Sequence, residues 1–527
     1  MTYVGSWLLI LELITVTLIT AYVAAFLKRR QTIIAYPIPG PQPSILNIFW
    51  PFGSELYIVM EQYMKNVRAG QALYELMDSL TSKYRSYGLY RMWFTFRPIV
   101  VLTRGNRADC LLKSTVETYK AKEVALIETW LGQGLLTSNG PKWQRKRKML
   151  TPVFHFNILE EFMPTMNKQA AQLTEILLEQ QNKRIDIFSY LGKCALNIIC
   201  ETAMGISIDA QRTENEYINS LRLITEGYMK RHLTPWLWSD IIYRISPSGR
   251  EYFRNLKVAH EFTRKVISIR MKELQEQPSL TEEVADESGV TRKKRPLLDS
   301  LLTKHLQDKE PTMEEIREEI DTFIFTGHDT VAVALMWSLY LLGLHPEVQA
   351  KVHDELDRVF GDDRTRAIIT EDLNKLKYLE CVIKETLRLY PSAPLIAREV
   401  IHGCNIGEYH LTSGVTVFID IFHIHRDPEV FENAEKFDPD RFLPQNAANL
   451  KPYAFIPFSG GPRNCVGQKF AIQEDKIVLA TLLRRLQVKS LVPQERMKVF
   501  FEVVLRPAEL IELEVRERPK DNNNYFK

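Results

Sequence analysis

The residues whose types and spacing most clearly suggest chemistry lie at positions 458–467, where the sequence reads FSGGPRNCVG. The amphipathic run that follows, residues 468–486, predicts a helix. Glycines and a proline just before a helix leave a loop whose backbone N–H groups can point inward, and Cys465 lies where the helix dipole favours an anion. We therefore expect the helix terminus to lower the pKa of the Cys465 thiol and to make its thiolate available as a metal ligand.

A thiolate inside a loop of N–H donors has the surroundings that an axial ligand of haem iron needs, because those hydrogen bonds set how much electron density the sulfur gives to the iron. Arg463 could reach a haem propionate. The alternative is a buried structural cysteine beside a glycine turn. The pattern that runs from Phe458 through Gly461 to Gly467 resembles the haem-binding signature of the cytochrome P450 monooxygenases at every fixed position. By that resemblance Cys465 is the iron ligand, and Phe458, Gly461 and Arg463 belong to the cofactor site.

A second candidate group lies inside a long helical pattern at residues 313–344, which ends at His345-Pro346. Burying ionisable groups costs free energy unless each finds a partner, and a glycine inside a helix costs about 1 kcal/mol more. Gly327 would let a ligand approach or the helix bulge locally, while Asp329 and Thr330 could relay protons from water. The alternative is that neighbouring backbone satisfies both side chains. The group resembles the family's oxygen-activation motif, in which the acid and the alcohol deliver the protons that split the O–O bond.

Trp143 and Arg147 form a third candidate group, because residues four apart share one face of a helix. They could donate an indole N–H and a guanidinium to one buried anion, which leaves Arg145 and Lys148 on a basic outer face. The alternative is a solvated charge run. The pair resembles the Trp-x-x-x-Arg helix by which the family holds a haem propionate, although many members have histidine where this chain has Lys146.

Glu385 and Arg388 lie three apart on another predicted helix, residues 378–390, and can pair on one face. Together with Arg441 they resemble the family's buried Glu-Arg-Arg cluster, which has a structural role under the haem. We also expect pocket-lining residues and a further propionate contact in the segment that follows this helix: Ala393, Pro394 and Leu395 for the pocket, and Arg398 for the propionate.

The bulk composition describes an ordinary globular protein that can bury a cofactor: 527 residues, 45% hydrophobic and 25% charged. The net charge is +3 and the basic residues are spread over the whole length, so no nucleic-acid partner is expected. The six cysteines are too few and too irregular for a disulfide framework, and no pair has zinc-site spacing. A reducing compartment is expected for the folded part.

Residues 7–27 are almost continuously apolar, with Glu12 the only charge, and approach the ~20 residues that a helix needs to cross a bilayer. Lys28, Arg29 and Arg30 follow this run, which favours an anchor over a cleaved signal and holds the C-terminal side in the cytosol. Four prolines within residues 37–43 predict a stiff linker. The expected division is a membrane anchor at 1–30, a linker at 31–44 and a catalytic domain at 45–527.

Helical patterns dominate the chain after the linker, with strand-like stretches at 87–103, 415–421 and 500–514 and a charged loop at 275–296. These patterns predict a mainly α fold with a small β region, in the α+β class. The motifs occur in the order and spacing of the cytochrome P450 fold, and residues 319–330 resemble its family-4 branch, in particular its insect-like microsomal members.

That resemblance implies a monooxygenase of the endoplasmic reticulum membrane that inserts one oxygen atom from O₂ into an apolar substrate: a fatty acid, a hormone or terpenoid, or a foreign chemical. Electrons would come from NADPH through cytochrome P450 reductase, with cytochrome b5 as a second candidate donor. Many family-4 members have a glutamate, able to form an ester with haem, where this chain has Thr326, so haem b is expected to be non-covalent.

Other functions are compatible with parts of the sequence. A haem-thiolate isomerase or dehydratase acting on peroxides shares the cysteine loop but needs no protons for O–O cleavage, and the Asp329-Thr330 pair argues against it. A non-enzymatic haem sensor and a membrane-anchored structural protein without haem are the remaining alternatives.

Overall fold

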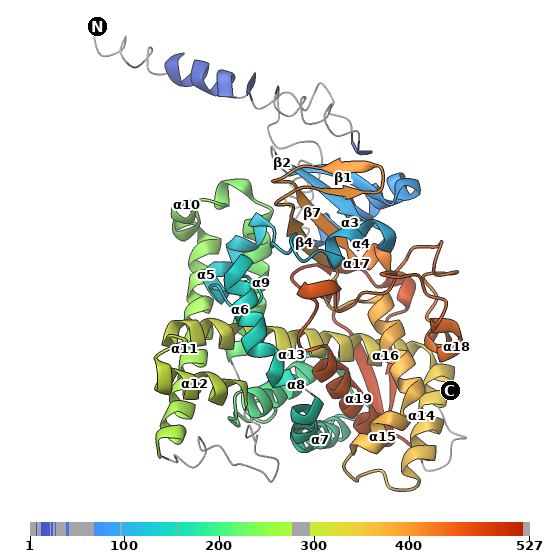
Figure 1. The fold of residues 1–527 in the computed structure, drawn as a ribbon. Coiled ribbons are helices and arrows are strands. Elements are labelled where there is room, and N and C mark those ends of the chain that lie inside the picture. The colour runs from blue at the N-terminus through green and yellow to red at the C-terminus, as the bar shows by residue number, and fades with distance from the viewer. Residues whose placement is uncertain are drawn as a thin grey trace.

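Helix α13 (Met313–Leu344) runs through the middle of the molecule and carries the second motif (Figure 1). It begins with a capping box, in which Thr312 Oγ1 accepts a hydrogen bond from the Glu315 N–H and Glu315 Oε2 accepts one from the Thr312 N–H. It ends at Leu344, because Pro346 disfavours the helical conformation at His345, the residue that precedes it. Its bounds agree with the predicted helix.

The computed structural model describes residues 68–94, 97–154, 156–214, 216–276 and 296–519, with short N-terminal pieces at 7, 12–21, 23–24, 27 and 38–41. The other helices in this part of the chain are α3 (Ala69–Tyr84), α4 (Gly105–Lys113), α5 (Glu128–Leu131), α6 (Gly140–Leu150), α7 (Phe156–Leu178), α8 (Ile187–Ala203), α9 (Glu216–His232), α10 (Asp240–Ile245), α11 (Pro247–Glu276), α12 (Leu297–Asp308), α14 (Pro346–Phe360), α15 (Thr370–Lys375), α16 (Lys377–Leu389), α17 (Ile421–Ile424), α18 (Pro444–Ala447) and α19 (Gln468–Arg485). Helices α8, α16 and α19 pack against α13 and bury its apolar middle.

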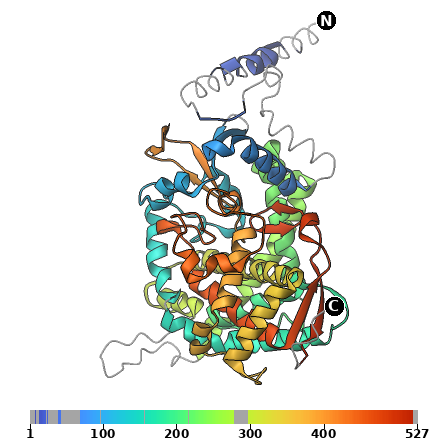
Figure 2. The ribbon, with the colours of Figure 1, turned by 90° about the vertical axis from the view of Figure 1, so that its right-hand side faces the viewer.

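The strands are β1 (Leu89–Phe94), β2 (Arg97–Leu102), β3 (Arg184–Asp186), β4 (Leu395–Glu399), β5 (Cys404–Ile406), β6 (Tyr409–Leu411), β7 (Thr416–Asp420), β8 (Leu486–Ser490), β9 (Val499–Phe501), β10 (Leu505–Pro507) and β11 (Glu512–Glu517). The largest sheet has the order β1-β2-β7-β4, and its β2–β7 pairing is parallel. Strands β3, β11 and β8 form another sheet, which Figure 2 shows along one side of the helical body.

The predicted strand pair at 87–103 is confirmed as the antiparallel β1–β2 hairpin. The strand-like stretch at 500–514 is wrong as one element, because it divides into the end of β9, β10 and the start of β11. Leu486 also begins β8 rather than ending α19. The charged loop predicted at 275–296 and most of the proline-rich linker lie outside the described residues.

The described N-terminal pieces include an apolar helix at Glu12–Ala21 whose hydrophobic side chains are exposed. It is shorter than a membrane span in its described part. Among the described helices, α13 is the one long and apolar enough to cross a membrane, and 78% of its apolar window is buried inside the protein. Helix α13 is therefore a core helix, and the anchor predicted at residues 7–27 falls partly on residues that the structure does not describe.

Candidate active site

Specific backbone contacts determine the shape of the cysteine loop. The Cys465 N–H donates to the Phe458 carbonyl oxygen at 2.9 Å, which closes the loop before α19. Gly461 has a φ of 67°, and a Cβ at this position would stand 1.7 Å from the carbonyl oxygen of Leu112 on α4. Only glycine tolerates both the left-handed backbone and this close approach. Cys465 thus lies between the short helix Gly461–Arg463 and the N-terminus of α19.

Cys465 lines a cavity of about 280 Å³ between this loop and α13. Several residues singled out in the sequence also line it: Trp143, Arg147, Gly327, Thr330, Phe458 and Arg463. Others do not reach it: Asp329, Pro394, Leu395, Arg398 and Gly461. The expectation for the segment after α16 is therefore only partly correct: Ala393 lines the cavity as predicted, whereas Ser392 and Ile396 line it in place of Pro394 and Leu395.

The pKa expected for Cys465 is wrong in direction. Burial among protein atoms raises the pKa of the thiol, and this effect exceeds the lowering by the Gly467 N–H and by Arg147. The exposed surface of the side chain belongs to the cavity that it lines. In the protein without a metal the loop alone does not stabilise a thiolate, so a bound cation would have to supply that stabilisation.

Arg463 and Arg147 are both anchored by backbone and amide oxygens rather than by acids. Arg463 donates to the carbonyl oxygens of Thr118 and Ser138 and lies 4.1 Å from the ring centroid of Trp143. Arg147 donates to Asn464 through both the main-chain carbonyl oxygen, at 2.8 Å, and the side-chain oxygen, at 2.7 Å. Both positive charges are thus held at the edge of the cavity with their orientation fixed.

Sequence reasoning missed Lys120, which also lines the cavity. Arg398 lies behind Arg463 in a smaller hollow and donates to the Ala397 carbonyl oxygen. Burial lowers the pKa of Arg398 to about 10, and burial together with the neighbouring charges of Arg398 and Arg147 lowers the pKa of Arg463 to about 9. Within the described part of the chain, none of Lys120, Arg147, Arg398 and Arg463 forms an ion pair with a carboxylate. Buried cations without acidic partners indicate a site for an anionic ligand.

Helix α13 presents Thr330 and Gly327 to the cavity. The Thr330 hydroxyl donates to the Thr326 carbonyl oxygen at 2.7 Å, and the Thr330 carbonyl oxygen accepts from Ser392 Oγ at 2.8 Å. The helix is continuous here, so the local bulge considered for Gly327 is absent from the described helix. A Cβ at Gly327 would stand 2.8 Å from Ile199 Cδ1 on α8, so a larger residue here would have to push the end of the Ile199 side chain aside.

Asp329 is buried on the side of α13 that faces away from the cavity. Arg506 Nη2 lies 2.7 Å and 2.9 Å from its two carboxylate oxygens. Sequence reasoning missed this partner, because Arg506 lies in β10, 177 residues away, and has no local signal.

Lys146, which stands where many family members have histidine, is buried and pairs with Glu319 of α13 at 2.6 Å. Glu319 Oε2 also accepts from the Leu135 N–H at 2.9 Å. Burial nevertheless raises the pKa of Glu319. Lys146 thus ties α6 to α13 and does not line the cavity.

The predicted Glu-Arg-Arg cluster is present and buried. Glu385 accepts from Arg388 at 2.7 Å and 2.8 Å and lies 3.4 Å from Arg441. Arg388 also donates to the carbonyl oxygen of His425, whose Nε2 accepts from the Ile456 N–H at 2.8 Å. His425, which the sequence did not reveal, therefore links the cluster to the chain that leads into the cysteine loop.

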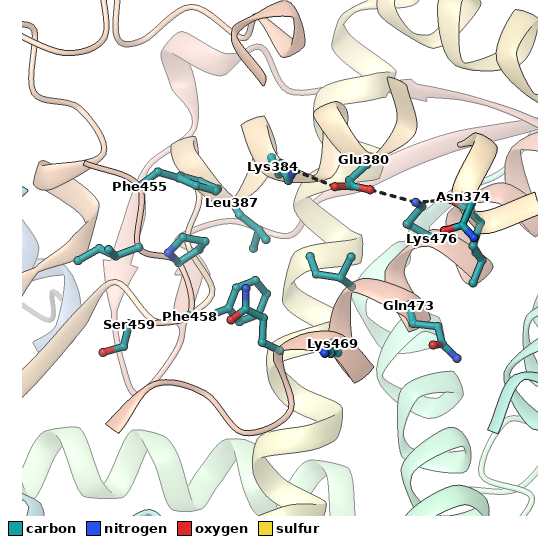
Figure 3. Close-up of a pocket in the computed structure, with 15 residues that line it drawn as sticks. Asn374, Glu380, Lys384, Leu387, Phe455, Phe458, Ser459, Lys469, Gln473 and Lys476 are labelled. Atoms are coloured by element: carbon teal, nitrogen blue, oxygen red, sulfur yellow. Dashed lines mark hydrogen bonds and ion pairs between the residues drawn. The ribbon is translucent and has the colours of Figure 1, made fainter. Parts of the chain in front are cut away.

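Two further features of the site had no sequence signal. Asp475 of α19 is the one carboxyl group among the described residues that line the cavity, and burial raises its pKa well above the usual value. A second cavity, of about 460 Å³, shares Phe458 and Ser459 with the first (Figure 3). There Glu380 lies between Lys384 and Lys476, at 2.7 Å and 3.1 Å.

Haem fits this donor set. Cys465 would offer its sulfur to the iron, and the cationic edge made by Arg147, Arg463 and Lys120 would suit two propionates. The indole N–H of Trp143 also makes no hydrogen bond within the described part of the chain. Apolar side chains, among them Phe470, Ile199 and Val331, form the remaining walls.

Comparison with known proteins gives consistent similarities over the whole body. The sequence model of the cytochrome P450 family matches residues 51–515. Cytochrome P450 4V2 of Mus musculus is 42% identical over 465 residues, which cover 87% of this chain and 88% of that protein. Cytochrome P450 4V2 of Homo sapiens is 42% identical over 457 residues, 86% of each chain. Cytochrome P450 4c3 of Drosophila melanogaster is 36% identical over 512 residues, 95% of this chain and 93% of that protein.

Proposed function

The chain belongs to the cytochrome P450 family, and from that premise we propose that it inserts one oxygen atom from O₂ into an apolar fatty acid, hormone or terpenoid, or foreign chemical. It is a haem-thiolate monooxygenase whose cofactor is non-covalently bound haem b. The observation that carries the substrate class is the cavity beside Cys465, whose walls are largely apolar away from the cationic edge. An apolar ligand leaves water when it enters such a cavity, which favours binding.

Haem bound here supplies the reductive activation of O₂. Cys465 would hold the iron, while Trp143, Arg147 and Arg463 would hold the propionates. The Thr330 hydroxyl, which lines the cavity, would pass on a proton that reaches it from Asp329, which lies outside the cavity lining and pairs with Arg506. Supporting roles fall to residues that shape the site: Gly327, Arg398, Phe458 and Gly461.

Electrons for this reaction come from NADPH through cytochrome P450 reductase, with cytochrome b5 as a second donor. Two observations support docking on the cysteine side of the molecule. Arg145 and Lys148 are exposed on α6, whose other face holds Trp143 and Arg147. The second cavity, which touches the cysteine loop, has the exposed Lys469 on its wall. Positive side chains favour an acidic partner.

The N-terminal segment anchors the protein in the endoplasmic reticulum membrane, with the catalytic domain at 45–527 in the cytosol. The exposed apolar helix at Glu12–Ala21 and the basic residues Lys28, Arg29 and Arg30 support this arrangement. Deleting residues 1–30 should move the protein from the membrane pellet to a high-salt wash while its haem spectrum stays unchanged. A truncated protein that needs detergent for release would contradict an anchor confined to this segment.

Turnover under heavy-isotope O₂ tests the proposed reaction. The protein, reductase and NADPH are incubated with a panel of fatty acids, terpenoids and insecticide-like compounds. We expect at least one product that gains a single labelled oxygen atom, and no product when NADPH is omitted. A protein that binds haem through its thiolate but oxidises no member of the panel would contradict the proposed substrate classes.

A further inference from the structure

Asp329 belongs to a buried charged group that extends beyond the motif on α13. The group has three members, from α13, from β10 and from the turn before β10: Asp329, Arg506 and Glu502. Their side chains are only 6%, 11% and 10% exposed. One guanidinium thus stands between two carboxyl groups in an environment where water screens charges weakly.

The contacts within this group are unequal. Arg506 Nη2 makes two short hydrogen bonds to Asp329, whereas Arg506 Nε lies 3.8 Å from Glu502 Oε2. Thr225 Oγ1 of α9 lies 3.4 Å from Glu502 Oε2, but its one proton goes to the nearer Arg222 carbonyl oxygen, at 2.9 Å. Arg506 Nη1 is buried and has no hydrogen-bond partner among the described residues. Glu502 is therefore the weakly held member of the group.

The segment that carries Arg506 is fixed relative to the cavity. The Leu505 N–H donates to the Ser392 carbonyl oxygen at 2.9 Å, and Ser392 Oγ donates to the Thr330 carbonyl oxygen at 2.8 Å. Arg506 also lies 4.6 Å from the ring centroid of Phe188, which limits its movement. These contacts connect β10 directly to the residue of α13 that faces the cavity.

Each element that packs around Glu502 places a titratable or charged group near it. They are Asp329 on α13, Arg506 on β10, Glu226 on α9 and Arg68 before α3, with His328 and Tyr217 beyond Asp329. Burial is the main cause that raises the pKa of Glu502, Asp329 and Glu226 act in the same direction, Arg506 and Arg68 oppose them, and the resulting pKa is about 7. At neutral pH this carboxyl can therefore hold or release a proton, and the exposed Glu226 places solvent within its surroundings.

We propose that Glu502 is the proton reservoir for Asp329 during monooxygenation, and that Arg506 is the positioning residue that keeps the two carboxyl groups near one another. A monooxygenase takes up protons with its electrons, because the oxygen atom that is not inserted leaves as water. The Glu502 carboxyl gives its proton through water to the Asp329 carboxylate, and Asp329 then passes a proton on toward Thr330. Glu502 is reprotonated from solvent on the α9 side. This inference rests on the proposed function.

Infrared titration tests the reservoir without turnover. In the full-length haem-loaded protein, we expect protonated-carboxyl absorbance that disappears as the pH rises through about 7, and Glu502→Gln should remove one component of it. Burial also raises the pKa of Asp321 to about 7, so the component that Asp321→Asn removes is assigned separately. The matched control is Glu509→Gln, an exposed acid of the same C-terminal segment, which should leave the absorbance unchanged. Neutral-range absorbance of undiminished intensity in Glu502→Gln would contradict the proposal.

The second measurement is the coupling of the reaction, which is the amount of product formed per NADPH oxidised, at several pH values. Wild-type coupling should fall as the pH rises through about 7, and Glu502→Gln should lower it at least about threefold with a flat pH profile. Glu502→Asp should restore part of the dependence. An intact thiolate haem spectrum and unchanged substrate affinity show that the variants fold.

The two possible failures are distinguishable. Wild-type protein that forms no product contradicts the proposed function. Wild-type product with an unchanged coupling profile in Glu502→Gln contradicts the reservoir alone.

Discussion

At the level of single residues, the site depends on which polar groups find a partner inside the protein. Arg463 and Arg147 are oriented by neutral oxygens, so their positive charges remain available to a ligand. Asp329, in contrast, is paired with Arg506. The cations at the edge of the cavity thus keep their charge for a ligand, whereas the charge of Asp329 is balanced inside the protein.

Replacing Cys465 tests the iron ligand. Cys465→Ala should abolish the red-shifted band of the reduced CO complex that marks thiolate ligation in this family, because the other described residues that line the cavity offer no thiol. Cys381→Ala, which changes a buried cysteine of α16, is the matched control and should keep the band. A red-shifted band in Cys465→Ala would refute the assignment.

Thr326 should leave haem without a covalent tether. Its hydroxyl donates to the Thr322 carbonyl oxygen at 2.7 Å and cannot form the ester that a glutamate forms. Acid and organic solvent should therefore remove all haem from the wild-type chain in denaturing chromatography. Haem absorbance that travels with the polypeptide would contradict this expectation.

Thr326→Glu places a carboxylate on the cavity wall and should restore some covalent haem. We also expect it to move hydroxylation of a fatty acid toward the chain end, because a tethered haem leaves less freedom in the cavity. Glutamine has the size of glutamate but cannot form an ester, so Thr326→Gln should change neither the amount of covalent haem nor the position of hydroxylation. Equal product positions in all three proteins would refute the second effect.

At the level of elements, the loop and helices are held by contacts that admit few substitutions. Gly461→Ala combines a left-handed φ of 67° with a clash against the Leu112 carbonyl oxygen. Gly414→Ala has a φ of 86° but open space, so it reports the backbone strain alone, about 1 kcal/mol. We expect Gly461→Ala to lower haem content several-fold and Gly414→Ala to leave it nearly unchanged, as measured by the reduced-CO spectrum. Equal losses would show that the contact with α4 is unimportant.

His423 joins α17 to α3 and should make stability depend on pH. It lies 2.7 Å from Asp420 and 3.2 Å from Asp78, and these two acids outweigh the effect of burial and raise its pKa to about 9. Because the folded-state pKa exceeds the unfolded value of 6.5, the stabilisation is complete below pH 6.5 and is lost as the pH rises through about 9.

The free energy of unfolding in urea measures this contribution. The difference between wild type and His423→Gln should shrink by about 3 kcal/mol between pH 6 and pH 10. His410→Gln, at an exposed histidine, should show no such change. A pH-independent difference for His423→Gln would contradict the charged state of this side chain.

At the level of the whole molecule, charge on the surface should govern the electron supply. Changing Arg145 and Lys148 to Glu reverses the charge of two exposed side chains. It should slow reductase-driven turnover several-fold and reduce its salt dependence, because charge attraction steers the reductase to this face and salt screens that attraction. Peroxide-driven turnover bypasses the partner and should survive. Reversing the exposed Lys257 and Lys265 of α11 is the matched control. Equal loss of both activities would indicate a folding contact.

The sequence by itself determined the features that depend on neighbours in the chain. The capping box at Thr312 and the proline at 346 set the bounds of α13, and the glycines before Cys465 set the shape of its loop. The four-residue spacing of Trp143 and Arg147 placed both on the cavity. Helix periodicity and turn chemistry act over a few residues, which is why pattern reasoning could reach them.

Tertiary structure alone decided the features that depend on burial and on distant partners. The pKa of Cys465 rises because surrounding atoms remove water, and the Gly467 N–H and the charge of Arg147 are too weak to reverse that effect. Lys120 joins Arg463 although 343 positions separate them in the chain, and Asp329 meets Arg506 across 177. The desolvation of a side chain and its charge partner depend on all the groups within a few ångströms of it. Folding brings those groups together from distant parts of the chain, so no local pattern in the sequence reveals them.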